Sequence, residues 1–240
     1  MIIDIHNHLG FSDDGGEAPL EMILENIETY AIDKLVLFAI DEVDSGPTYE
    51  NSNQKVLNTC KQYPDKLIPF ARLMPSEGQK AIEEFARCRK AGVKGLKLKT
   101  KDGFAPEDAI PILNMIDQNE KFPIIMHVEH EAVAQPKIWE PIIKDYRHIN
   151  FIFAHGAKDH YRICGEMLCE HPNLYCDTTT LSYNRTKWLY RKAGSEKIVF
   201  GSDFPYSHPG IELKKFEVII KDKNDLDNIL YKNAQKLLDI

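Results

Sequence analysis

The sequence predicts a single α/β domain, a (β/α)8 TIM barrel, and two observations favour this fold. Eight short apolar runs recur along the 240 residues, with helical patterns in the segments between them. Most runs are continuously apolar instead of alternating, as expected for parallel strands that are covered on both faces. No linker rich in Pro, Gly or Ser divides the chain, so residues 1–240 are expected to form one domain. The predicted strands are residues 2–5, 35–40, 67–73, 95–98, 123–128, 151–154, 174–176 and 198–200.

Helices are predicted between the strands because apolar residues recur there three and four positions apart. This spacing is clear over residues 20–27 and again over residues 226–238. Gly92 is expected to cap the C-terminus of the helix that precedes the fourth strand. Asp108 is the expected N-cap of the next helix, with Pro111 tolerated in its first turn. A doubly wound open sheet would produce a similar alternation, so the positions of the polar residues must separate the two folds.

Composition argues against several classes of partner. The net charge is −7, so a nucleic-acid partner, which requires a basic face, is not expected. No apolar run is long enough to span a bilayer, and the N-terminus lacks the basic region of a secretory signal. Five cysteines without a CxxC pair indicate reduced thiols. We therefore expect a cytoplasmic protein that acts on a small molecule.

Ionisable or metal-binding residues stand where the predicted strands end. Catalytic groups of barrel enzymes lie at this end of the strands, so their placement favours the barrel over the open sheet. Threonines 178–180 could line the same pocket, although threonines at a strand end more often reflect β propensity. His130 and His208 follow strand ends and could touch a substrate. The strand-end residues are His6 and His8, Asp41 and Glu42, Arg72, Lys97 and Lys99, His127 and Glu129, His155, Asp177, and Asp203.

The first strand carries the most specific of these signals. His6 and His8 are two residues apart in a strand, so both side chains point to the same face. Two converging imidazoles form half of a site for zinc or a similar divalent ion. An isolated HxH pair would more often be structural or exposed. Here His127, His155 and Asp203 also follow hydrophobic runs, and the presence of these further potential ligands favours a metal site.

Several segments together resemble one family over the whole chain. They are IIDIHNH at the start, then GVKGLKLK, PIIMH, FAHG and FGSDFP, and finally ILYKNAQKLLDI. In the last segment, Asn233 and Ala234 match the family's NA pair. On these segments the chain resembles the amidohydrolase superfamily, and within it the amidohydrolase-related branch of short barrels.

The resemblance implies a divalent metal, expected to be one zinc, held by His6, His8, His127 and Asp203. It also implies that Asp203 acts as a general base toward a water that the metal activates. His155 is then either a catalytic group that polarises the substrate or a ligand of a second metal. The alternative role of Asp203 is to cap a helix in the Ser–Asp–Phe–Pro turn.

Lys97 and Lys99 share the inward parity of the fourth predicted strand. Relatives with two metals use a carbamylated lysine on this strand, whereas relatives with the GxKGxK pattern often use one metal. Many of the latter carry His where Lys99 stands. We predict that Lys99 binds an anionic part of the substrate, ahead of a structural ammonium and of a bridging carbamate.

Three functions remain open at this point. The favoured one is hydrolysis of a small amide, lactone or related carbonyl compound by metal-activated water. The second is metal-dependent, non-oxidative decarboxylation of a small carboxylated substrate, because the same branch contains such enzymes. The third is a barrel that binds a metal or ligand without catalysis, which the presence of both His155 and Asp203 disfavours. The polar loops between strands and helices suggest a polar ligand, and a homodimer is the expected assembly.

Overall fold

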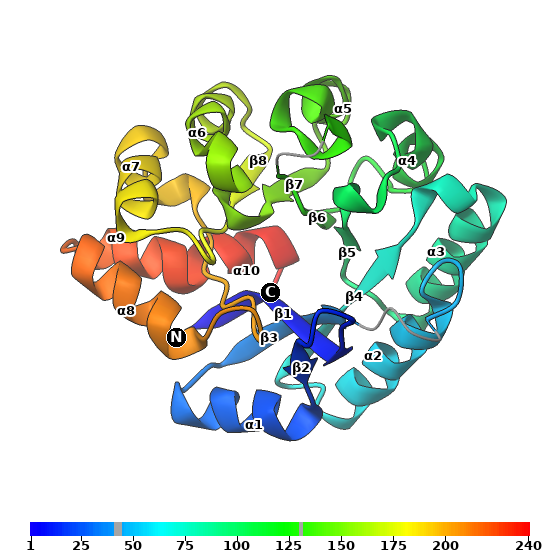
Figure 1. Cartoon of the computed structure of the whole chain (residues 1–240), viewed down its shortest axis with the longest axis horizontal. Coiled ribbons are helices and arrows are strands. Elements are labelled where there is room, and N and C mark those ends of the chain that lie inside the picture. Colours follow the sequence, from blue (N-terminus) through cyan, green and yellow to red (C-terminus); the bar gives the residue numbers. More distant parts are fainter. Residues whose placement is uncertain (41–44, 130–131) are drawn as a thin grey trace.

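The computed structural model describes residues 1–40, 45–129 and 132–240, and its strands lie inside a ring of helices (Figure 1). Eight strands form one sheet in the order β2-β1-β3-β4-β5-β6-β7-β8. Neighbours from β1 onward are parallel, and β2 alone is antiparallel, as a short hairpin on β1. The strands are β1 (Ile3–Phe11), β2 (Glu17–Ala18), β3 (Lys34–Ala39), β4 (Leu67–Leu73), β5 (Gly95–Leu98), β6 (Pro123–Met126), β7 (Asn150–Phe153) and β8 (Leu174–Cys176).

Residues 198–200, the predicted eighth barrel strand, close the barrel without forming a regular strand. Val199 donates its N–H to the carbonyl of Cys176 at 2.9 Å, and Ile5 donates to the carbonyl of Phe200 at 3.0 Å. The N–H of Phe200 instead reaches the carbonyl of Ile229 in the C-terminal helical segment at 2.9 Å. The segment therefore joins β8 to β1, which confirms the barrel, but its ladder is interrupted by a helix.

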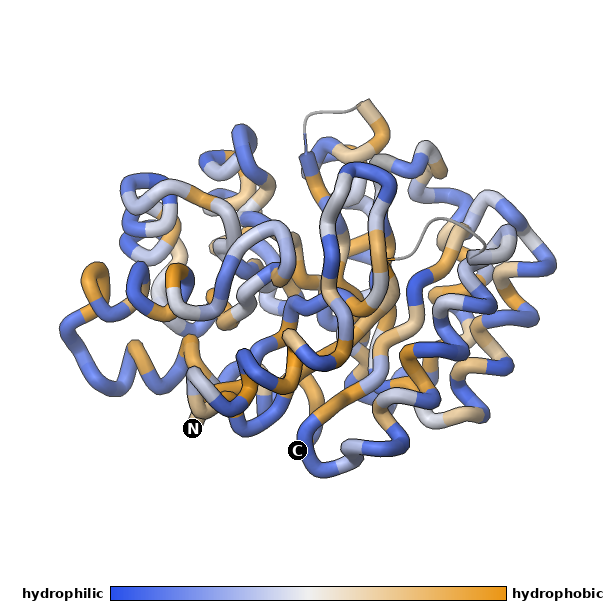
Figure 2. The backbone as a smooth tube through the Cα atoms, turned by 60° about the horizontal axis from the view of Figure 1, so that its bottom comes forward, coloured by the Kyte–Doolittle hydropathy of each residue, from blue (hydrophilic) through white to orange (hydrophobic). Residues whose placement is uncertain are grey.

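Helices surround the strands, and each exposes a polar face. In Figure 2 the tube of the helices alternates between orange and blue, as amphipathic helices require. In the described ranges no helix has the length and apolar character needed to cross a membrane. The α-helices are α1 (Leu20–Thr29), α2 (Glu50–Gln62), α3 (Gln79–Ala91), α4 (Pro106–Leu113), α5 (Glu140–Asp145), α6 (Tyr161–Glu170), α7 (Tyr183–Ala193), α8 (Pro209–Ile219), α9 (Lys223–Asp227) and α10 (Asn233–Leu238).

Two predicted helix caps have different outcomes. Gly92 ends α3 in the left-handed conformation with φ 96°, as predicted. Asp108 is not the N-cap of α4, so that prediction is wrong. The helix begins at Pro106, since proline suits the first helical position, and Asp108 lies in its first turn. From there its carboxylate accepts the N–H of Ala105 at 2.8 Å.

Side-chain parity divides the apolar residues into two layers. On β3, Val36 and Phe38 pack in the cluster inside the barrel, whereas Leu37 packs in a cluster with α1 residues. The same alternation turns Lys97 on β5 inward, between two leucines of the outer cluster, and turns His127 inward, two residues after an interior isoleucine of β6. Apolar residues of α10 complete the interior cluster. The functional site lies at the opposite ends of the strands, away from the packing with α10.

Gly95 marks a close approach inside the sheet, and its replacement by alanine is expected to destabilise the fold. A Cβ atom there would lie 2.3 Å from the Phe70 ring and 2.6 Å from the carbonyl oxygen of Pro123. Such overpacking costs about 1–3 kcal/mol, which lowers the melting temperature by about 2–4 °C per kcal/mol in a chain of this size. Thermal unfolding of Gly95→Ala measures this. The neighbouring exposed variant Lys94→Ala is the control, and equal melting temperatures for both would contradict the packing.

Candidate metal centre

A cavity of about 440 Å³ opens at the C-terminal ends of the strands. It is lined by strand-end residues that the sequence singled out, together with residues of the β1–β2 hairpin and of the turn after residue 203. Its volume falls in the range of sites for small molecules. Charged or metal-binding lining residues include His8, Arg72, Lys97, Lys99, His127, His155, Lys158 and Asp203.

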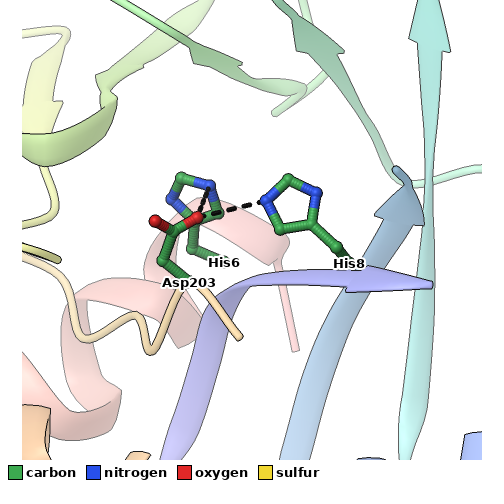
Figure 3. Close-up of side chains that lie close together, drawn as sticks. All are labelled: His6, His8 and Asp203. Atoms are coloured by element: carbon green, nitrogen blue, oxygen red, sulfur yellow. Dashed lines mark hydrogen bonds and ion pairs between the residues drawn. The ribbon is translucent and has the colours of Figure 1, made fainter. Parts of the chain in front are cut away.

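Three of the four predicted metal ligands meet at the base of this cavity. Nε2 of His6 lies 3.0 Å from Oδ1 of Asp203, and Nε2 of His8 lies 3.1 Å from the same oxygen. Figure 3 shows both rings, from β1, turned toward the carboxylate. One potential ligand atom from each residue lies within 4.8 Å of the others, and all three residues are buried. Two imidazoles and one carboxylate are a donor set that suits a divalent cation.

His127 and His155 lie beside this cluster. Nε2 of His155 is 3.3 Å from Nδ1 of His127, and Nδ1 of His155 is 3.7 Å from Oδ2 of Asp203. Over the part of the chain that the structure describes, the compact groups of ligand atoms around His6 do not include His127. The structure thus brings His6, His8 and Asp203 together directly, and places His127 in the same cavity next to His155.

The backbone at two of these residues is in the left-handed region. Asp203 has φ 56°, and its N–H donates to the carbonyl of His6 at 2.7 Å. His155, Gly156, Ala157 and Lys158 have consecutive φ values of 58°, 50°, 59° and 45° after β7. A left-handed residue other than glycine costs about 1–2 kcal/mol. Backbone strain of this kind collects at functional sites, which agrees with a site here.

The protonation states suit cation binding. Burial lowers the pKa of His8 to about 3 and that of His155 to about 4, so both rings are neutral near pH 7. Burial also opposes ionisation of Asp203, but the charge of His6 and the hydrogen bonds from the histidines hold its pKa well below the usual range. Burial and Lys97 lower the pKa of His6, and the carboxylates of Asp203 and Asp177 outweigh them and raise it. Carboxylates and neutral imidazoles are the forms that bind metal ions, so a cation at His6 competes with the proton on that ring.

Lys97 on β5 and Lys99 just after it lie in different parts of the site. Nζ of Lys97 lies 3.2 Å from Nε2 of His6 and 5.0 Å from the centre of the Phe38 ring. Burial lowers the pKa of Lys97 to about 8. Lys99 lies farther out on the cavity wall, with Nζ 3.7 Å from Oδ1 of Asp102. Lys97 therefore belongs to the base of the site and Lys99 to its wall.

Other strand-end predictions have mixed outcomes. Asp177 is fully buried and its Oδ2 lies 2.8 Å from Nδ1 of His6, closer to the cluster than its position after β8 alone indicated. His208 caps α8, where its Nδ1 accepts the N–H of Gly210 at 3.3 Å, and it does not line the main cavity. Asp41, Glu42 and His130 lie outside the described residues.

One wall of the cavity is built from contacts that no sequence pattern identifies. The guanidinium of Arg72 donates through Nη2 to the hydroxyl of Tyr49 at 2.8 Å and to Asp102 at 3.0 Å. It also stacks 3.9 Å from the centre of the Tyr49 ring. Tyr49 precedes α2 and Asp102 ends a short 3-10 helix after β5, so only the fold brings them to Arg72. At the opposite rim, the Tyr206 hydroxyl donates to Asp14 at 3.2 Å.

Together the fold and the site define a class: a TIM barrel with a buried histidine and carboxylate cluster, suited to a divalent metal, at the catalytic end of its strands. The family model described as amidohydrolase matches residues 3–240, and the chain belongs to this family. This confirms the resemblance seen in the sequence motifs. Family membership and the donor set both support a divalent metal.

Solved structures support the fold at low sequence identity. An uncharacterised TIM-barrel protein from Bordetella bronchiseptica is 16% identical with TM-score 0.78, covering 99% of each chain. A 2,6-dihydroxybenzoate decarboxylase from Rhizobium is 13% identical with TM-score 0.75, covering 99% of this chain and 98% of its own. A dihydroxybenzoic acid decarboxylase from Polaromonas sp. JS666, solved with bound manganese, is 13% identical with TM-score 0.72, covering 99% and 96%. A search of curated proteins finds no match to this sequence.

Proposed function

We propose that the protein is a metal-dependent hydrolase of a small carbonyl compound such as an amide or a lactone. The observation that carries this proposal is the cluster of His6, His8 and Asp203, whose ligand atoms lie within 4.8 Å of one another beside a cavity. We assign His127 as the fourth ligand, and one zinc as the preferred ion because imidazole nitrogen dominates the donor set. The proposal keeps the cytoplasmic location and the homodimer predicted from the sequence.

The residues of the site have separate roles in this proposal. When bound, a divalent ion lowers the pKa of a water and polarises a substrate carbonyl. Asp203, held as a carboxylate, accepts a proton from the attacking water and passes it to the leaving group. His155 is neutral at pH 7 and its Nδ1 lies 3.7 Å from Oδ2 of Asp203, where the ring orients the substrate. The buried walls limit the access of bulk water to these groups.

Decarboxylation is the second candidate, and one observation favours it. The cavity is lined by Arg72, Lys97 and Lys99, a set of positive charges that suits a carboxylated substrate. Two of the three similar structures described above are decarboxylases of aromatic acids. Product analysis of the metal-loaded protein in isotopically labelled water separates the two reactions. Label in the product carboxyl group supports hydrolysis, whereas release of carbon dioxide without addition of water would contradict it.

Lys99→Met is expected to raise KM for carboxylated substrates by about 10- to 100-fold. A hydrogen bond to a charged group contributes about 1.5–3 kcal/mol, and kcat changes little when an interaction common to ground and transition state is lost. Steady-state kinetics with a carboxylated substrate and its neutral analogue measure the effect. Lys99→Arg, which keeps the charge, is the matched control. An equal loss with the neutral analogue would indicate that Lys99 is a structural partner of Asp102.

A further inference from the structure

Beneath the proposed ligands, a buried carboxylate contacts residues from three parts of the chain. Asp177 follows β8 and has no exposed surface. We propose that Asp177, acting directly on His6 and through Thr179 on His155, is the positioning residue that fixes which nitrogen of each ring carries its proton. The catalytic consequence of this inference rests on the proposed function, but the hydrogen-bond network itself does not depend on turnover.

Four donors converge on the two oxygens of Asp177. Oδ2 accepts from Nδ1 of His6 at 2.8 Å. Oδ1 accepts from the backbone N–H of His155 at 2.9 Å, from the backbone N–H of Thr179 at 3.0 Å and from the Thr179 hydroxyl at 2.7 Å. An ionised carboxylate is an acceptor only, so every one of these contacts must be made by a donor.

The direction of the next hydrogen bond follows from the single hydroxyl proton of Thr179. That proton is donated to Asp177, so the Thr179 oxygen can only accept at its 2.7 Å contact with Nδ1 of His155. Nδ1 of His155 therefore carries the proton. A neutral imidazole has one N–H, so Nε2 of His155 keeps its lone pair. The reverse direction would place two acceptors 2.7 Å apart at Asp177, a buried contact with no proton in it.

His6 is oriented by the same carboxylate. Its Nδ1–H donates to Asp177, so Nε2 is the nitrogen left for a cation, and it faces Asp203 at 3.0 Å and Lys97 at 3.2 Å. A histidine ligand that donates its other N–H to a carboxylate is held in one orientation and becomes more basic. Asp177 thus prepares Nε2 of His6 for a cation and Nε2 of His155 for a proton, from a single buried carboxylate.

An alternative reading makes His6, His155 and Asp177 a second metal site, because their ligand atoms also lie within 4.8 Å of one another. The hydrogen bonds favour the positioning role. Both oxygens of Asp177 are already engaged at 2.7–3.0 Å, and Nδ1 of His155 contacts Thr179 at 2.7 Å. A cation between these atoms would have to displace that network.

Nitrogen NMR of protein containing ¹⁵N-labelled histidine tests the tautomer of His155 directly, in the metal-free protein. The expected result is a proton on Nδ1 of His155 in the unmodified protein, and loss of that preference in Thr179→Val. Thr179→Ser, which keeps the hydroxyl, restores the Nδ1–H tautomer. A proton on Nε2 in the unmodified protein, or no change in Thr179→Val, would overturn the inference.

Zinc affinity, measured by competition with a chromogenic chelator, distinguishes the contact of Asp177 with His6 from its contact with Thr179. Asp177→Asn is expected to weaken zinc binding by about 10- to 100-fold, as loss of a carboxylate partner of a ligating histidine does. Thr179→Val leaves the contact between Asp177 and His6 in place, so its zinc affinity should stay within about twofold of the unmodified protein on the same reasoning. Equal zinc affinities for Asp177→Asn and the unmodified protein would contradict the role at His6. If His155 shows the predicted tautomer but no turnover is detected, the hydrolase proposal is contradicted and this inference still holds.

Discussion

Asp203→Asn is expected to lower kcat by about 10²- to 10⁴-fold, the contribution of a positioned general base. An asparagine side chain has nearly the same shape as aspartate but cannot take up a proton near pH 7. The substitution also removes the negative charge that lies 3.0 Å from His6 and 3.1 Å from His8. Steady-state kinetics of the zinc-loaded variant measure the loss, and circular dichroism checks the fold.

The matched control is Asp65→Asn, an exposed aspartate remote from the cavity lining. Its kinetic constants should equal those of the unmodified protein. If Asp203→Asn kept full activity, its assignment as the base would be wrong. Activity undetectable in every form, with zinc still bound, would instead favour the third function, a barrel that binds a metal or ligand without catalysis.

Removal of the metal is expected to abolish activity and to lower the melting temperature. A ligand present at about 100 times its dissociation constant stabilises the folded state by about 2.7 kcal/mol, which corresponds to roughly 5–10 °C here. Dialysis against a chelator, followed by addition of zinc or manganese, measures both effects. One equivalent per chain should restore activity, and two equivalents would contradict the single-metal proposal.

The variant His8→Ala tests whether the stabilisation by zinc depends on the proposed site. Without one of the two β1 imidazoles, added zinc should no longer raise the melting temperature by that amount. Lys34→Ala on β3, whose ammonium contacts the carbonyl of Asp65 and not the cavity, is the control and should respond to zinc as the unmodified protein does. An unchanged thermal response of His8→Ala would remove His8 from the ligand set.

Much of the barrel could be predicted because parallel strands leave a strong local signal. Continuous apolar runs placed β4, β5 and β8 with the bounds that the structure shows. The two-residue strand β2 is too short for any periodicity, so its pairing with β1 had no signal in the pattern. Residues 198–200 are apolar like a strand, but the N–H of Phe200 bonds to Ile229, a contact decided by the packing of the last helices.

The site followed a similar division between local and tertiary information. Parity on one strand was enough to bring His6 and His8 to one face, and the position of Asp203 after the last apolar run brought it to the same cluster. The network around Asp177 could not be read in this way. Asp177 and His6 are 171 positions apart, and their 2.8 Å contact depends on how β8 and β1 approach each other when the barrel closes.

A crystal structure of the zinc-loaded protein, with anomalous scattering at the metal edge, would locate the metal and its ligands in one measurement. We predict one peak at the base of the cavity, with nitrogens of His6, His8 and His127 and an oxygen of Asp203 at about 2.0–2.2 Å. A peak at Glu140, Glu170 and His171, the third compact cluster of ligand atoms among the described residues, would contradict it. So would a metal in the cavity that His6, His8 and Asp203 do not contact.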